Sequence, residues 1–581
     1  MSAADELAPP RRTASRRRRE PTPRAAADPR RWAWRAGLAL LLLVAFHLRS
    51  RGVSHGLPYV YNVDENAHFV PTAIGLFGHG WDPDYFVNPP AYTYLLHLVL
   101  LVAYGGREAV SASFASDPSG VFELARLTSA ALGAIAVGLL YLAGARLFDR
   151  RVGMLAAGVL TVAFLPVFYG HLGLNDSPTL APVCLALAGI AGVLRGGRRR
   201  DFAMAGVGLG LACATKYTGG IVLLALVAAA AHRRAWPALA GAGVLALVTF
   251  VVANPYAVLD FDAFWEGIRH QSEASGEVGG KLGLTASSGF AYYAWVLTWG
   301  LGWVPALAAL GGAVGLWLRD RAAFWTLVPA VVAFLLFMGI QERYFGRWLM
   351  PILPVLCLLA AWAAVVAVDA LAHRWPAAGP SLAAVAIVAL CAQGVVASVH
   401  IGFTLQREDT RNQARAWMVK NIPRGTRVVV EPVVPDAWAT DVGSASGARW
   451  IKWPGLRARF ADDGRRYEVE ERPAVNIEDY ERTLQPELVD DYLKAGYCWV
   501  LSGSTQRGRA EAEPEVVPGA IAYYRRLERE AELVYRASPY RPGRGPVDFN
   551  FDWSFDFYPL AYERPGPVME VYRLSGGECA A

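Results

Sequence analysis

Residues 32–48 read WAWRAGLALLLLVAFHL, and this run decides the class of fold. A helix that crosses the hydrocarbon core of a bilayer needs about 20 mainly apolar residues, with a range of about 17–25. Apolar runs of this kind recur from Trp32 as far as Phe403. The chain of 581 residues is 54% hydrophobic and only 18% charged. The sequence therefore predicts a mostly α-helical, polytopic membrane protein.

The segment before this run is strongly basic. Nine arginines lie between Arg11 and Arg31, among many Pro and Ala residues. Residues 1–31 are therefore predicted to be a disordered cytoplasmic tail near anionic lipid headgroups. Because no small-residue cleavage site follows the apolar run, a signal peptide is not expected. The net charge of +6 resides largely in this tail and in short loops, so we expect no nucleic-acid partner.

The short basic loops predict the topology, because Lys and Arg collect in cytoplasmic loops. Five such loops contain twelve arginines in total: 146–151, 195–200, 232–234, 319–321 and 373–374. With all five inside, the path has about eleven transmembrane helices: 33–50, 124–145, 153–170, 178–194, 202–214, 217–231, 236–253, 290–317, 322–340, 349–369 and 380–403. The N-terminus is then cytoplasmic, and the chain is a multi-pass protein of the plasma membrane.

Residues 51–122 are predicted to form one large external loop within a transmembrane domain of residues 32–404. Pro89–Tyr104 is apolar, but sixteen helical residues reach only ~24 Å, short of the hydrocarbon thickness. We expect this segment and Asn66–Gly80 to be helices along the membrane interface. Lys216 is predicted to be an external turn residue. The alternative is one long helix over 202–231 with a buried lysine, which is costly.

Residues 405–581 have the composition of a soluble domain, which the topology places outside the membrane on the extracytoplasmic side. Helices are predicted at 411–421, 486–495 and 520–533, and strands at 427–431, 498–501 and 569–574. This alternation predicts an α/β domain with a parallel or mixed sheet. A disulfide between Cys498 and Cys579 is compatible with that location. The run Phe549–Tyr558 alternates aromatic and polar residues, which fits either an arm packed on the membrane domain or a sugar-binding lip.

Two adjacent carboxylates, Asp64 and Glu65, follow the first apolar run by about fifteen residues. A carboxylate there can accept a proton, hold a metal or pair with a cation. The topology brings further polar residues to the same face: Asn88, Arg126, His171, Asp176, Lys216, Tyr217, 254–256, Glu342, Arg343, Tyr344 and Arg347. Each also has a structural interpretation, such as a helix cap for Asp176 or interface anchors for Arg343 and Arg347. Together, the cations suit a phosphate anion and the carboxylates suit a proton acceptor.

Residues 33–405 resemble the GT-C superfamily of glycosyltransferases that use polyprenyl-phosphate sugars. The nearest groups are the protein O-mannosyltransferases and the aminoarabinose transferases. The resemblance rests on the order of Asp64-Glu65 and five short segments: NPPAYTYLL at 88–96, ELARL at 123–127, HLGLNDSP at 171–178, ATKYTG at 214–219 and ERYFGRWLMP at 342–351. Asn88 stands where the family usually has His. The extra domains of eukaryotic mannosyltransferases are missing from the sequence, which weakens the case for a protein acceptor.

The resemblance implies transfer of a hexosyl or pentosyl group from a polyprenyl-phosphate donor to a lipid, glycan or protein acceptor, with inversion. Asp64 would be the general base, and Glu65 would orient the acceptor or support Asp64. Arg126, Lys216 and Arg343 would bind the donor phosphate. Asn88, His171, Asp176, Tyr217 and Tyr344 are the candidate substrate-binding residues.

Three alternatives to this interpretation stay open. No cofactor is required by the chemistry, but Asp64 and Asp176 could share a divalent metal. A transporter is the rival class of protein, since intramembrane charge often marks a substrate path. A non-catalytic scaffold of the same fold is the third interpretation.

Overall fold

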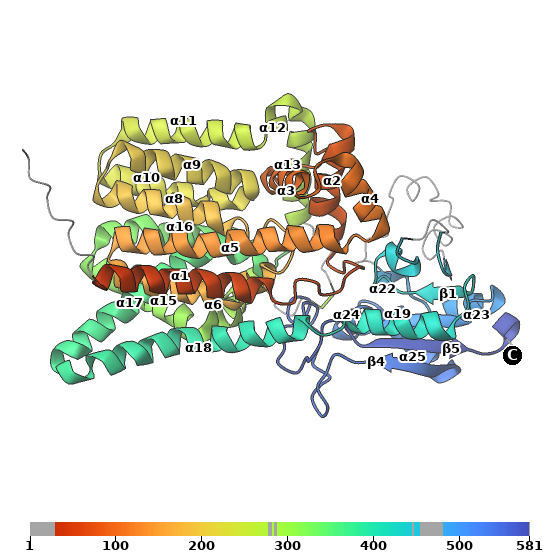
Figure 1. The fold of residues 1–581 in the computed structure, drawn as a ribbon. Helices are drawn as coiled ribbons and strands as arrows, with labels where there is room; N and C mark the ends of the chain where they lie inside the picture. The colour runs from red at the N-terminus through yellow and green to blue at the C-terminus, as the bar shows by residue number, and fades with distance from the viewer. Residues whose placement is uncertain (1–28, 277–281, 284–287, 444–446, 454–479, 580–581) are drawn as a thin grey trace, which may run out of the picture.

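The protein consists of a bundle of long helices with a smaller α/β domain beyond one end of it (Figure 1). The computed structural model describes residues 29–276, 282–283, 288–443, 447–453 and 480–579. The predicted N-terminal tail, apart from its last three residues, lies outside these described residues. The predicted class of fold, a polytopic helical protein with a C-terminal α/β domain, is confirmed.

Seven helical stretches of the described residues are long and apolar enough to cross a membrane, or eight if one bent pair counts as a span. They comprise α1 (Pro29–Ser50), α5 (Ser119–Leu147), α11 (Trp236–Ala253), α14 (Gly289–Leu297) with η3 (Thr298–Gly302) and α15 (Trp303–Arg319), α16 (Arg321–Gly339), η4 (Gly346–Ile352) with α17 (Leu353–Arg374), and η5 (Pro376–Ala378) with α18 (Gly379–Leu405) and α19 (Thr410–Asn421). Each long stretch up to Leu405 coincides with a predicted span.

The other four predicted spans are built from shorter helices. These are α6 (Arg150–Val162), α7 (Phe164–Tyr169), α8 (Leu180–Arg195), α9 (Arg199–Thr215), η2 (Tyr217–Ile221) and α10 (Val222–His232). Several of them lie mostly inside the bundle, where α8 packs on α5 and α9. Neighbouring helices therefore shield them from lipid, so a short apolar helix is sufficient there. The sequence count of eleven includes these four segments, which are too short to meet the length criterion alone.

Lys216 separates α9 from η2, as the sequence predicts. Its backbone is extended, with φ −154° and ψ 124°, so the helix ends at Thr215. The alternative of one continuous helix over 202–231 is therefore wrong.

The predicted basic loops lie close to one another. Arg195 donates to the carbonyl of Leu147 at 2.8 Å and pairs with Asp320. Arg151 pairs with Asp369, near the end of α17, at 2.7 Å. Figure 1 shows α17 and α18 meeting at the bundle end that lies away from the C-terminal domain. Charge pattern and structure thus agree that these loops share one face.

The segment between α1 and α5 forms a group of short helices beside the opposite end of the bundle (Figure 1). It contains η1 (Glu65–Phe69), α2 (Val70–His79), α3 (Ala91–Tyr104) and α4 (Arg107–Ser116). The axes of α3 and α4 differ by 92°, so the two do not form one straight span. Two more short helices, α12 (Tyr256–Leu259) and α13 (Phe261–Gly276), follow α11 on this side.

The C-terminal domain is built on a five-stranded mixed sheet in the order β2-β1-β3-β5-β4. The strands are β1 (Arg427–Val430), β2 (Ile451–Lys452), β3 (Trp499–Gly503), β4 (Ala531–Ala537) and β5 (Met569–Leu574). β1 pairs in parallel with β2 and β3, and β5 is antiparallel to β3 and β4. The remaining elements are η6 (Asp436–Ala439), α22 (Tyr480–Thr483), α23 (Leu488–Lys494), α24 (Ser504–Ala512), α25 (Pro518–Glu530) and η7 (Gly577–Cys579).

Helices cover both faces of this sheet. Met418 of α19 packs with Val428 and Met569 on one face, and Tyr523 of α25 packs with Val500 on the other. The predicted helix over 520–533 extends too far, because α25 ends at Glu530 and β4 begins at Ala531. Cys498 and Cys579 form the disulfide that the sequence allowed.

The arrangement predicts opposite accessibility for the two ends of the bundle. A cysteine at Arg198, an exposed residue of a basic loop, should react with a membrane-impermeant maleimide only after the inner face is opened. A cysteine at Asp548, an exposed residue of the C-terminal domain, should react in intact cells. Labelling of both positions from the same side would contradict the topology.

Candidate active site

The adjacent carboxylates Asp64 and Glu65 point into different environments. The Glu65 side chain is fully buried, whereas the Asp64 side chain keeps 35% of its surface exposed. Both lie at the start of η1, where the amide of Asn62 accepts a hydrogen bond from the Glu65 backbone N–H at 3.1 Å. Adjacent residues on a helix point about 100° apart, so a step of one residue separates the buried carboxylate from the accessible one.

Glu65 is held by a bidentate ion pair with Arg126 of α5. Arg126 Nε and Nη2 each donate to one carboxylate oxygen at 2.8 Å, and the backbone N–H of Gly173 adds a third bond at 2.7 Å. Arg126 Nη1 also donates to the carbonyls of Val53 and His55, at 2.6 and 2.8 Å. The pair thus ties together three segments: the chain after α1, helix α5 and the loop after α7.

This geometry bears on the predicted phosphate role of Arg126. Its side chain is about 1% exposed, and its donors are directed at Glu65 and at two backbone carbonyls. Placement of Arg126 therefore favours a structural role, and Glu65 supports the segment that presents Asp64.

Asp64 is paired with Arg347, the second residue of η4. Arg347 Nη2 lies 2.6 Å from Asp64 Oδ2, and the guanidinium stacks over the Phe345 ring with its Cζ 4.8 Å from the ring centroid. Phe345 is extended, so the turn of η4 starts only at Gly346. Arg343 therefore precedes the helix. The interpretation of Arg343 and Arg347 as interface anchors requires the two residues to share one helix, and residues 343–347, which the structure describes, do not form such a helix.

A second ion pair lies beside the first. Lys216, at the break between α9 and η2, pairs with Asp176 from the loop before α8, and both side chains are largely buried. Asp176 is close enough to Arg347 to interact with its charge. Lys216 and Asp176, a cation and a carboxylate that the sequence placed on the same face, thus pair with each other near Asp64.

Polar side chains extend from the Lys216–Asp176 pair toward the segment that carries Asp64. Asn175 donates to the carbonyl of Thr215 at 2.8 Å and to Asn88 Oδ1 at 3.4 Å. Asn88 in turn donates to the Tyr85 hydroxyl at 2.9 Å, and Tyr85 stacks on His68 with ring centroids 4.6 Å apart. Burial raises the pKa of Tyr85 to about 12, so its hydroxyl stays protonated at neutral pH.

The other predicted residues have more peripheral places. Tyr217 donates to the carbonyl of Phe86 at 2.9 Å, and Tyr344 is buried against Tyr292 with ring centroids 4.6 Å apart. His171 is fully buried and its Nδ1 bonds the Val167 carbonyl at 2.9 Å. Burial lowers the pKa of His171 to about 4, which keeps the imidazole neutral. Arg343 lies with its Cζ 5.6 Å from the Phe345 ring centroid.

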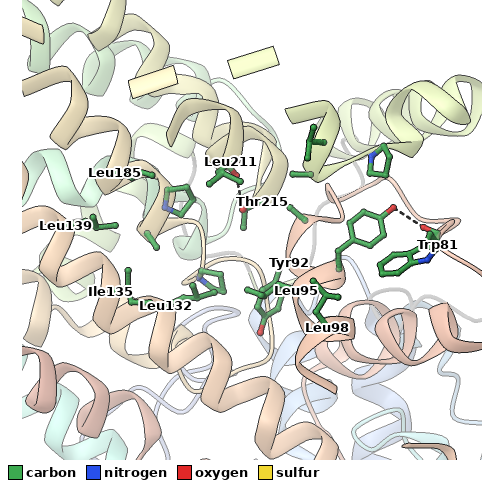
Figure 2. Close-up of a pocket in the computed structure, with 18 residues that line it drawn as sticks. Trp81, Tyr92, Leu95, Leu98, Leu132, Ile135, Leu139, Leu185, Leu211 and Thr215 are labelled. Carbon is green, nitrogen blue, oxygen red and sulfur yellow. Dashed lines mark hydrogen bonds between the residues drawn. The ribbon is translucent and has the colours of Figure 1, made fainter. Parts of the chain in front are cut away.

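An apolar groove of about 560 Å³ lies among α3, α5, α8 and α9 (Figure 2). Leu132, Ile135 and Leu139 form a row on α5, with Leu185 of α8 and Leu211 of α9 opposite. Thr215 and Pro178 also line the groove, and they lie one and two residues from the Lys216–Asp176 pair. Part of the groove wall therefore belongs to the same chain segments as the Lys216–Asp176 pair.

The C-terminal domain also reaches the cluster. Asp552 accepts hydrogen bonds from the backbone N–H of Gly346, at 2.8 Å, and from the Tyr292 hydroxyl. Asp556 lies 3.5 Å from the Tyr169 hydroxyl and within electrostatic range of Arg347. Sequence reasoning missed both residues. The polar positions of the run Phe549–Tyr558 are the signal that could have indicated them.

Within the described ranges, no group of three or more His, Cys, Asp or Glu side chains could hold a metal. Asp64 and Asp176, the pair suggested for a shared metal, each have a cationic partner instead.

Residues 119–258, from α5 into α12, match the family described as dolichyl-phosphate-mannose-protein mannosyltransferase. No curated protein sequence matches the chain significantly.

Solved structures extend the likeness to nearly the whole chain. ArnT from Cupriavidus metallidurans, bound to undecaprenyl phosphate, is 13% identical, with 94% of this chain and 98% of that chain covered and a TM-score of 0.50. The Archaeoglobus fulgidus oligosaccharyltransferase in the apo form is 14% identical. The match covers 90% of this chain and 75% of that chain, with a TM-score of 0.53. The same archaeal enzyme, AglB, in complex with an inhibitory peptide and a dolichol-phosphate is also 14% identical. That match covers 90% of this chain and 75% of that chain, with a TM-score of 0.51. The predicted GT-C-like fold is confirmed.

The buried pair predicts that Arg126→Ala is strongly destabilising. Removing one partner of a buried ion pair leaves an uncompensated charge, at a cost of about 3–5 kcal/mol. Circular dichroism of the purified protein should show a lower thermal midpoint for Arg126→Ala, and an unchanged one for the control Glu108→Ala on the exposed face of α4. Equal midpoints for the two variants would contradict the structural role.

Proposed function

We propose that this protein is a membrane glycosyltransferase that moves a sugar from a polyprenyl-phosphate donor to an acceptor hydroxyl. The observation that carries the proposal is the partly exposed Asp64 carboxylate, paired with Arg347 within electrostatic range of the Lys216–Asp176 pair. The GT-C-like fold and the mannosyltransferase family match support it.

The donor's polyprenyl chain would occupy the groove between α5 and α8. Its walls are apolar, and Ile135 is 51% exposed there. A chain in this position would bring its phosphate to the groove end at Lys216. The ArnT and AglB structures, which are bound to undecaprenyl phosphate and dolichol-phosphate, support a ligand of this class.

Lys216, Arg343 and Arg347 are the cations proposed for the donor phosphate. Arg347 takes the place of Arg126 in this assignment, because Arg126 is enclosed by Glu65 and backbone carbonyls. Arginine guanidinium groups suit phosphate oxygens, since they offer several donors in a planar fork. Asn88, Asp176, Tyr217 and Tyr344 would shape the pocket around the sugar, and neutral His171 would support the loop beneath it.

In the reaction, the acceptor oxygen forms a bond to the anomeric carbon while the bond from that carbon to the phosphate oxygen breaks. The acceptor proton passes to Asp64, and polyprenyl phosphate leaves as an anion. Attack opposite the leaving group inverts the anomeric carbon. The cations stabilise the charge that develops on the leaving phosphate, so no general acid is needed.

Arg347 would link donor binding to the base. Without donor, its guanidinium occupies Asp64 Oδ2. The monoanionic phosphodiester of the bound donor competes for the same guanidinium, which leaves the Asp64 oxygen available to the acceptor hydroxyl. This order of events would keep Asp64 from acting as a base until the donor is bound.

The site would face the extracytoplasmic side. The Cys498–Cys579 disulfide lies in the domain next to the site, and disulfides persist mainly in oxidising compartments. The basic loops lie toward the opposite end of the bundle, as the positive-inside rule requires for this orientation.

Asp64→Asn should fold normally but lose about 10²–10⁴-fold in transfer rate, the usual contribution of a general base. Mass spectrometry of envelope glycans, lipids and proteins from a deletion strain identifies the sugar and its acceptor. Transfer is then measured with the purified protein.

The matched control is Asp117→Asn, an exposed carboxylate whose Oδ1 accepts the Ser119 N–H, a bond that asparagine preserves. It should transfer sugar at the wild-type rate. Wild-type transfer by Asp64→Asn would show that the base assignment is wrong.

Filling the groove should weaken donor use selectively. Ile135→Trp should raise the KM for the donor about tenfold with kcat largely unchanged, since losing burial of about two CH₂ groups costs that much affinity. Val314→Trp, at an exposed position of α15 outside the groove, is the control. An equal KM for both variants would place the polyprenyl chain elsewhere.

A further inference from the structure

The C-terminal segment Phe549–Tyr558, termed the arm, packs against the membrane domain. Trp553 and Tyr558 contact Trp299 with ring centroids 5.2 and 4.9 Å apart, and Tyr558 contacts Phe168 at 4.6 Å. These aromatic contacts confirm the simpler sequence interpretation, an arm packed on the membrane domain. They also hold the arm in place where its polar residues meet η4.

Asp552 is the arm residue in direct contact with η4. Its side chain is 2% exposed, and Oδ2 accepts both the Gly346 N–H, at 2.8 Å, and the Tyr292 hydroxyl. A Cβ atom on Gly346 would lie 2.6 Å from this oxygen, so only glycine allows the approach. A buried carboxylate is costly unless hydrogen bonds satisfy it, which indicates a specific rather than incidental contact.

The contact between Asp552 and Gly346 matters for Arg347, because the two residues of η4 are adjacent. Gly346 is the first residue of η4 and directly precedes Arg347, whose guanidinium holds Asp64. Fixing the Gly346 backbone therefore fixes the origin of the Arg347 side chain. A long side chain needs such a fixed base if its guanidinium is to be held in one geometry.

We propose that Asp552 is a positioning residue through which the C-terminal domain sets Arg347 for the donor phosphate and for Asp64. This inference rests on the proposed function. It makes the C-terminal domain part of the active site, although no residue of the arm needs to touch the substrate.

Asp556, a second carboxylate of the arm, lies within electrostatic range of Arg347. Burial, and then the neighbouring Asp552, raise the pKa of Asp556 well above its usual value, which favours its neutral form. A neutral Asp556 does not compete for the guanidinium. Asp64 then remains the carboxylate that pairs with Arg347.

The test is binding of undecaprenyl phosphate to the purified full-length protein in detergent, measured by native mass spectrometry and a thermal-shift titration. Asp552→Ala should weaken binding about ten- to hundredfold, because an imprecisely held arginine loses charged hydrogen bonds. Asp552→Asn should bind within about threefold of wild type, since its amide oxygen can accept both hydrogen bonds. Gly346→Ala, which disturbs the same contact from the other side, should resemble Asp552→Ala.

A double-mutant cycle separates positioning from general stability. In an Arg347→Ala background, adding Asp552→Ala should cause no further loss of binding. Asp548→Ala, an exposed carboxylate beside the arm, is the control and should bind like wild type.

Three results would overturn the inference. These are wild-type binding by Asp552→Ala, weak binding by Asp552→Asn, and an additional loss from Asp552→Ala when Arg347 is already absent. A wild-type protein that does not bind undecaprenyl phosphate would contradict the proposed function itself, together with the inference built on it.

Discussion

The buried ion pair between Glu65 and Arg126 is the interaction on which the rest of the site depends. It connects the chain after α1 to α5 and, through Gly173, to the loop that carries Asp176. Taking two charges out of water is expensive, and the cost is recovered only with good geometry and full hydrogen bonding. Both conditions are met here. Glu65 therefore has a structural role, and it holds the segment in which the neighbouring Asp64 stays accessible.

Three ion pairs of decreasing burial lead from the core to the open site. Glu65–Arg126 is fully enclosed, Lys216–Asp176 is largely buried, and Asp64–Arg347 retains solvent contact. Exposure determines what a pair can do. An enclosed pair is fixed, whereas an accessible pair can exchange a partner when a ligand of suitable charge arrives. In the proposed mechanism, the donor phosphate is that ligand and Arg347 is the group that exchanges.

Hydropathy and charge were sufficient to predict the helical spans, the break at Lys216 and the common face of the basic loops, since these depend on local composition. The same reasoning placed Asp64, Lys216 and Asp176 on one side. Hydropathy and charge alone could not separate Asp64 from Glu65, because the difference arises from Arg126, 61 residues further along. The separate roles of the two carboxylates came from the family resemblance. The resemblance implied a phosphate role for Arg126, since a sequence does not show that a guanidinium is already enclosed. The contact of Asp552 with Gly346 spans 206 residues and depends on how two domains pack, which no local pattern encodes.

The position of the donor phosphate relative to Arg347 decides whether the proposed mechanism is correct. The most direct measurement is an experimental structure of the full-length protein with undecaprenyl phosphate. We predict that the polyprenyl chain lies along Leu132, Ile135 and Leu139, that the phosphate contacts Lys216 and Arg347, and that Arg347 has left Asp64 Oδ2. A phosphate bound away from Lys216, with the Asp64–Arg347 pair intact, would contradict the account.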